Sequence, residues 1–95
     1  MTIDFIYDDA CPNVERAREH LRAALEQVGR TAVWVEHRIG DPDVPARARG
    51  YGSPSILVDG RDVAGDGSSA EQCCRIYADG DGVPPVAWIV RALES

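Results

Sequence analysis

The sequence predicts an α/β fold in which a four-stranded mixed sheet is flanked by helices. Two observations lead to this prediction. Near the start of the chain, an apolar segment, a long amphipathic segment and a second apolar segment follow one another, which is typical of a strand-helix-strand unit. Further along, Asp59-Gly60 separates two short segments of strand-like composition, which is a strong hairpin signal. The expected order is strand, helix, strand, short helix, two strands and two helices, in a single domain over residues 1–95.

The first half of this fold is the strand-helix-strand unit. Residues 2–7 carry apolar side chains at alternate positions and are predicted to form a buried or half-buried strand. Residues 12–28 carry apolar side chains at spacings of three and four, which places them on one helical face, and Gly29 supplies the stop. Residues 32–37 are apolar enough to form a second strand. Because a helix connects the two strands, we expect them to be parallel.

The second half of the fold is predicted to be antiparallel. Residues 46–49 form at most one or two helical turns, and residues 55–58 and 61–64 are the two strands of the hairpin. Residues 68–76 begin with a serine followed three positions later by a glutamate, the form of a capping box, so a helix is expected there. Two prolines open residues 84–93, whose apolar side chains share the face of a last helix.

The composition excludes several classes of function. A formal net charge of -6 over 95 residues argues against nucleic acids and anionic membranes as partners, because these are bound through Lys and Arg. No apolar run approaches the roughly 18 residues that span a membrane, and no signal peptide precedes residues 2–7. We therefore expect a cytoplasmic protein. Three cysteines without an export signal indicate reactive or metal-binding thiols rather than a disulfide framework.

Cys11 is the first candidate for chemistry because it lies where the first strand ends and the first helix begins. The N–H groups of a first helical turn have no partner within the helix, and the helix dipole favours negative charge there, so a thiolate is stabilised. Pro12 suits the first helical position, where its missing N–H costs nothing. The carboxylates of Asp8 and Asp9 act in the opposite direction, since nearby negative charge disfavours a thiolate. Cys11 is therefore either a nucleophile or a small buried side chain.

Two motifs resemble those of a known family. Residues 11–14 are Cys-Pro-Asn-Val, and residues 52–65 run from Gly-Ser-Pro through Asp-Gly to a final glycine. The first motif is similar to the C-P-x-C start of the glutaredoxin active-site helix, with Val14 in place of the second cysteine. The second is similar to the glutaredoxin stretch that begins with a cis proline and ends at a glycine pair. A third match is the C-R-x-Y tail at residues 74–77. With these three motifs, the chain resembles glutaredoxin-like small bacterial proteins of the thioredoxin-like superfamily.

The resemblance implies a thiol-disulfide oxidoreductase of thioredoxin-like fold whose nucleophile is Cys11. In this family the backbone of the residue before the cis proline pairs with an extended thiol substrate, so Ser53 and Pro54 are expected beside the cysteine. Cys74, Cys73 or an external thiol such as glutathione would resolve the mixed disulfide, and no resident cofactor or metal is implied. The other residues that the resemblance assigns to substrate binding are Pro12, Asn13, Gly65 and Asp66, the last of which replaces the second glycine of the usual pair.

Two alternatives of other classes are open at this point. Cys11 with Cys73 or Cys74 would suit a soft metal ion or mercury, because thiolates prefer such ions. The fold could also serve as a redox-inactive adaptor or dimerisation module, which the missing second active-site cysteine favours. For the leading hypothesis, the expected partner is a thiol or disulfide substrate, and the chain is expected to be a monomer or a weak homodimer. His20 and His37 are expected to be structural or solvated.

Overall fold

The computed structural model of the chain describes residues 2–31, 33–64 and 83–94. Its elements are β1 (Ile3–Tyr7), α1 (Val14–Gln27), β2 (Val35–Arg38), the 3₁₀ turn η1 (Ala46–Ala48), β3 (Ser55–Val58), β4 (Arg61–Asp62) and α2 (Val86–Glu94). The strands form one sheet in the order β2-β1-β3-β4. β1 is parallel to β2 and antiparallel to β3, and β3 is antiparallel to β4. The predicted α/β class and the four-stranded mixed sheet are confirmed.

Several element boundaries differ from those predicted. α1 begins at Val14 rather than at Pro12, because the first carbonyl to accept a helical hydrogen bond is that of Asn13, from the Ala17 N–H at 3.0 Å. β2 begins at residue 35 rather than 32. β4 ends at Asp62 rather than at residue 64, and just after the strand the Asp62 carboxylate accepts the N–H of residue 64 at 2.9 Å. The helix predicted over residues 68–76 lies outside the described residues.

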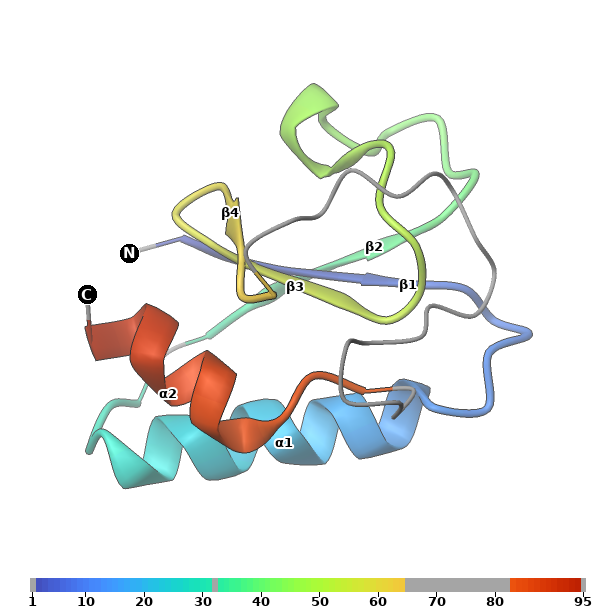
Figure 1. Cartoon of the computed structure of the whole chain (residues 1–95). Coiled ribbons are helices and arrows are strands. Elements are labelled where there is room, and N and C mark those ends of the chain that lie inside the picture. The colour runs from blue at the N-terminus through green and yellow to red at the C-terminus, as the bar shows by residue number, and fades with distance from the viewer. Residues whose placement is uncertain (1, 32, 65–82, 95) are drawn as a thin grey trace.

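Both described helices cover the same face of the sheet, and the segment that contains η1 lies over the other face (Figure 1). α1 and α2 pack against each other. His20 of α1 strengthens this contact, because its Nδ1–H donates to the carbonyl oxygen of Pro84, just before α2, at 2.8 Å. Neither α1 nor α2 is long and apolar enough to cross a membrane.

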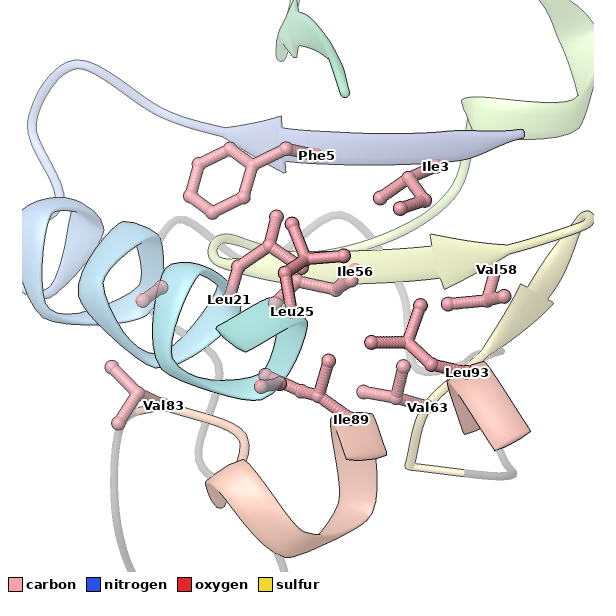
Figure 2. Close-up of a cluster of buried hydrophobic side chains, with 12 residues drawn as sticks. Ile3, Phe5, Leu21, Leu25, Ile56, Val58, Val63, Val83, Ile89 and Leu93 are labelled. Carbon is pink, nitrogen blue, oxygen red and sulfur yellow. The ribbon is translucent and has the colours of Figure 1, made fainter. Parts of the chain in front are cut away.

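The larger hydrophobic core fills the space between the sheet and the two helices (Figure 2). Because side chains alternate along a strand, β1 directs Ile3 and Phe5 into this core, while Ile6 points to the opposite face. A smaller core lies there, beneath η1. Figure 2 labels these buried members of the larger core: Ile3, Phe5, Leu21, Leu25, Ile56, Val58, Val63, Val83, Ile89 and Leu93. The buried members of the smaller core are Ile6, Val44, Ala48 and Leu57.

The end of α1 follows the predicted stop. Gly29 has a φ of 70°, its N–H donates to the Glu26 carbonyl at 3.1 Å, and the Arg30 N–H donates to the Leu25 carbonyl at 3.0 Å. This pair of bonds is a Schellman motif, in which a glycine in the left-handed conformation satisfies the last helical carbonyls. The chain therefore leaves the helix in a fixed direction toward β2.

The Asp59-Gly60 turn joins β3 and β4, as predicted. Both residues have a positive φ, 52° at Asp59 and 81° at Gly60, as a two-residue type I′ hairpin requires. We expect Gly60→Ala to lower the free energy of unfolding by about 1 kcal/mol, because a Cβ disfavours the left-handed backbone. The loss is conformational, since nothing lies within 4 Å of the added Cβ. Urea unfolding measures it.

Asp59→Asn is the matched control for this turn. Asparagine tolerates a positive φ, and its side-chain oxygen can still accept the hydrogen bond that the Thr2 N–H donates to Asp59 at 2.9 Å. This variant should unfold at the urea concentration of the wild-type protein. Equal stability of Gly60→Ala and the wild-type protein would contradict the prediction.

Candidate functional site

Cys11 lies in the loop between β1 and α1, two residues before Asn13, which stands at the N-cap position of the helix without a capping hydrogen bond from its side chain. Its N–H donates to the Asp8 carbonyl oxygen at 3.0 Å, so a turn from Asp8 to Cys11 carries the chain from strand to helix. The residue is only 6% exposed. Its sulfur lies 3.9 Å from the carbonyl oxygen of Ser53, and because a carbonyl only accepts, the thiol donates this weak hydrogen bond. The sulfur is therefore held against the peptide that precedes Pro54.

The Ser53-Pro54 peptide bond is cis, and it leads directly into β3. Both residues are buried. Ser53 Oγ accepts the Asp8 N–H at 2.9 Å, so this one residue contacts both ends of the turn from Asp8 to Cys11. On the other side, Ser55 Oγ donates to the carbonyl of residue 52 at 2.5 Å. The structure thus brings together three of the residues that the resemblance assigns to the site, Cys11, Ser53 and Pro54.

The carboxylates next to Cys11 both have partners. Asp8 Oδ1 accepts the N–H of Ala10 at 2.8 Å, within the same loop. Asp9 Oδ2 accepts from Arg38 Nη1 at 3.1 Å, in an ion pair that is exposed to solvent. The negative charge that the sequence places beside the thiol is therefore partly balanced by Arg38, which comes from β2. Sequence reasoning gave no indication of this cation, since it lies far from Cys11 along the chain.

The remaining predicted site residues are placed differently or are not described. Pro12 is exposed, and Asn13 is half-buried with its side-chain oxygen 3.4 Å from Nη1 of Arg16, which donates to it. Four others lie outside the described residues, namely Gly65, Asp66, Cys73 and Cys74. Cys11 is the free thiol of the described part of the chain, and its defining contact is with Ser53.

A metal site is not assembled by the described residues, among which no three His, Cys, Asp or Glu side chains are grouped to hold an ion. The soft-metal alternative requires Cys73 or Cys74 beside Cys11. It therefore depends on residues outside the described ranges.

Comparisons of the chain with protein-family models, with curated proteins and with solved structures give no match. The α/β architecture follows from the structure itself.

A second polar cluster lies on the sheet face opposite the helices. The fully buried Asp4 of β1 accepts a hydrogen bond from His37 Nε2 of β2 at 2.7 Å, and Arg47 of η1 donates to its two oxygens at 3.1 Å each. Burial raises the pKa of Asp4, but the hydrogen bonds and positive charges of Arg47 and His37 outweigh it, so the pKa lies below its ordinary value. The carboxylate ties η1 to the two strands.

A cavity of about 250 Å³ opens near this cluster, over the smaller core. Its lining includes Ile6 and Tyr51 as apolar walls and Arg38 and Arg49 as cations. Both cations are engaged, because Arg38 binds the Cys11 loop and Arg49 donates to carbonyl oxygens of its own loop at 2.9 and 3.3 Å. Cys11 is not among the lining residues, so the cavity is not part of the thiol site as described.

The Asp4 cluster is the feature that sequence reasoning missed. His37 is expected from the sequence to be structural or solvated, which agrees with its bond to Asp4, but no partner is assigned to Asp4. The available signal is that Asp4 stands between Ile3 and Phe5 in an otherwise apolar strand. A carboxylate in such a position is almost never buried without a partner.

Proposed function

We propose that the protein is a thiol-disulfide oxidoreductase of thioredoxin-like fold that works through Cys11. The observation that carries the proposal is the contact between the Cys11 sulfur and the Ser53 carbonyl oxygen at 3.9 Å. It joins the loop before α1 to the segment before β3, two regions that the resemblance assigns to one site. The order of the described elements and the mixed sheet are compatible with that fold.

The chemistry is an exchange in two steps. The Cys11 thiolate attacks one sulfur of a disulfide R–S–S–R′, which forms a Cys11–S–S–R bond, breaks the original S–S bond and releases R′–S⁻. An external thiolate then attacks the R sulfur of the mixed disulfide, which restores the Cys11 thiolate and leaves the external thiol oxidised in a new disulfide with R. One disulfide is consumed and one is formed, so no other oxidant or reductant is needed.

The surroundings of Cys11 suit the first step in two ways. The Ser53 carbonyl oxygen accepts a weak hydrogen bond from the Cys11 thiol, with 3.9 Å between sulfur and oxygen, and this contact orients the sulfur. The Asp8 N–H is already bound to Ser53 Oγ, which fixes the loop that carries the cysteine. An external low-molecular-weight thiol such as glutathione serves as co-substrate in this scheme, with Cys74 or Cys73 as the internal alternative.

The direct test is Cys11→Ser in an exchange assay with a small dialkyl disulfide and reduced glutathione. The wild-type protein should accelerate the exchange, and the variant should return it to the uncatalysed rate, because serine forms no disulfide. Mass spectrometry of the wild-type protein after a single turnover should find the mixed disulfide on Cys11.

A double variant, Cys73→Ser with Cys74→Ser, tests which thiol resolves the mixed disulfide. Turnover is preserved if an external thiol resolves it, and turnover is abolished if Cys73 or Cys74 does.

The proposal fails if the wild-type protein gives no acceleration and Cys11 forms no mixed disulfide at any glutathione ratio. Thermal unfolding of Cys11→Ser, followed by circular dichroism, is the necessary control. Serine is close to cysteine in size, so the variant should remain folded, and loss of activity then reports on the sulfur itself.

A redox-inactive adaptor or dimerisation module is the second candidate, and the burial of Cys11 favours it. A thiol that is 6% exposed resembles a structural cysteine, which is inert toward bulky reagents. In this case the wild-type protein and Cys11→Ser would behave alike in the exchange assay. Partner or self-association would then be the measurable activity.

A further inference from the structure

β2 lies at the margin of the fold, and of its side chains only that of His37 is largely buried, with 10% of it exposed. Its four residues, Val35–Arg38, contribute no side chain to either hydrophobic core, and three of the four are exposed. The strand is held instead by its ladder to β1 and by polar side-chain links to α1, to β1 and to the loop that carries Cys11. Glu36 binds Arg18 of α1 at 2.8 Å, His37 binds Asp4 at 2.7 Å, and Arg38 binds Asp9 at 3.1 Å.

These links hold β2 at the edge of the sheet as a preformed template. β1 lies on one side of it, and among residues 2–31, 33–64 and 83–94 no strand pairs with the other side. The Ile39 N–H, just after the strand, donates to the Tyr7 carbonyl of β1 at 2.8 Å. Because backbone groups alternate in direction along a strand, Glu36 and Arg38 direct their N–H and C=O groups away from β1. A strand edge of this kind is ready to pair with another chain.

The apolar surface of the described residues is concentrated at the same edge. Val33 is 91% exposed and Val35 is 52% exposed, and these two are the exposed large hydrophobic side chains of the described part of the chain. Two exposed valines beside this outer edge of β2 form a small surface that a further strand would cover.

We propose that β2 is the interface through which two copies of this chain associate, with the two β2 strands antiparallel and His37 at the centre. This pairing would join the two sheets into one. It uses no redox chemistry and therefore stands independently of the role of Cys11.

Charge complementarity selects the second copy as the occupant and fixes the register. Pairing centred on His37 places Glu36 of each copy directly opposite Arg38 of the other, with the outward backbone groups of both residues facing each other. Pairing centred on Glu36 or on Arg38 would instead place like charges opposite each other, which is destabilising. In the proposed register Val35 lies opposite Ile39 of the second copy, so one exposed valine gains an apolar neighbour.

The existing ion pairs do not prevent this association. A carboxylate has about four acceptor sites, of which Glu36 uses three for Arg18 and Trp34, and a guanidinium has five N–H donors. Glu36 and Arg38 can therefore keep these partners and Asp9 while they bind across the interface. α1 packs over β1 and β3 rather than over β2, because the larger core contains side chains of β1 and β3 and none of β2. Because the pairing involves a strand of only four residues in each copy, we expect it to bury less than the standard area of about 1,600 Å², so the dimer should dissociate on dilution.

The experiment is a charge swap across the predicted pair, followed by sedimentation velocity over a wide range of protein concentrations. Glu36→Arg alone or Arg38→Glu alone creates two like-charge pairs and should weaken self-association by about tenfold. The double variant with both substitutions restores opposite charges and should recover the association of the wild-type protein. In addition, the Glu36 and Arg38 amide protons of the wild-type protein should exchange more slowly with solvent as its concentration rises.

Arg18→Gln is the matched control, because it removes the charged partner of Glu36 within one copy and leaves the residues of the strand edge unchanged. It should associate like the wild-type protein. Thermal unfolding confirms that each variant is folded. The proposal is overturned if the wild-type protein stays monomeric at every concentration, which would leave the edge to a strand of another protein. It is also overturned if the folded double variant associates no better than the single ones, or if the single variants associate like the wild-type protein.

Discussion

Replacement of Asp4 by alanine should lower the free energy of unfolding by about 3 kcal/mol, toward the upper end for hydrogen bonds to a charged group. The fully buried carboxylate accepts three hydrogen bonds, one from His37 and two from Arg47, and the variant loses all of them. The cost is less than the sum of three such bonds, because the variant no longer has to desolvate a carboxylate. Urea unfolding at pH 7 measures the loss.

The control is Asp43→Ala, which removes an exposed carboxylate from the loop before η1. A surface change of this kind should stay within about 0.5 kcal/mol of the wild-type protein. If Asp4→Ala were as stable as Asp43→Ala, the Asp4 cluster would contribute nothing to the attachment of η1.

The contribution of the Asp4 carboxylate to the free energy of unfolding should also disappear at acid pH. Its pKa in the folded protein lies below the ordinary value of 3.8, because the bonds and charges of Arg47 and His37 outweigh the effect of burial. The Asp4 carboxyl therefore holds its proton less tightly in the folded protein than in the unfolded chain. The stabilisation that the carboxylate provides is complete above pH 3.8, and it is lost as the pH falls from 3.8 through the pKa of the folded state. The difference in stability between the wild-type protein and Asp4→Ala should narrow over this range. A difference that stays constant down to pH 2 would contradict the assignment.

The fold was predictable from the sequence wherever local signals agreed with each other. The period of the apolar residues in α1, the glycine stop at Gly29 and the Asp59-Gly60 turn each act over a few residues, and together they specify the order of the elements. β2 was less predictable. Its strand character comes from the ladder to β1 and from ion pairs to α1 and the Cys11 loop, whereas residue patterns report mainly on burial, which this strand lacks.

The candidate site was predictable only in part. The proximity of Cys11 to Ser53 and Pro54 followed from the resemblance, since composition and periodicity carry no information on which loops meet. The pairing of Asp9 with Arg38 could not be anticipated, because it depends on how the end of β2 lies beside the loop after β1. Such contacts between distant charges are set by tertiary structure, and the sequence shows only the charges.

Leu21→Ala should lower the free energy of unfolding by about 3 kcal/mol, within the range for a buried leucine whose removal leaves a cavity. Leu21 is fully buried on α1 and points into the core between the helix and the sheet (Figure 2). Glu19→Ala is the matched control, since it makes the same change to alanine on the exposed face of the same helix and should have an effect below about 0.5 kcal/mol. Urea unfolding of the two variants isolates the effect of burial from that of helix propensity.

The same pair of variants tests what holds Cys11 in place. The turn from Asp8 to Cys11 spans the gap between the end of β1 and the start of α1, so the docking of α1 on the sheet fixes the distance from the sulfur to Ser53. If the Cys11 thiol reacts only after α1 detaches from the sheet, Leu21→Ala should be alkylated at Cys11 up to about a hundredfold faster than the wild-type protein. This factor follows from the loss of about 3 kcal/mol in the free energy of unfolding, since each 1.4 kcal/mol is a factor of ten. Glu19→Ala should react at the rate of the wild-type protein. An unchanged rate in a destabilised Leu21→Ala would mean that the Asp8 and Ser53 hydrogen bonds hold the loop without the helix, and that the thiol is reached through a local opening.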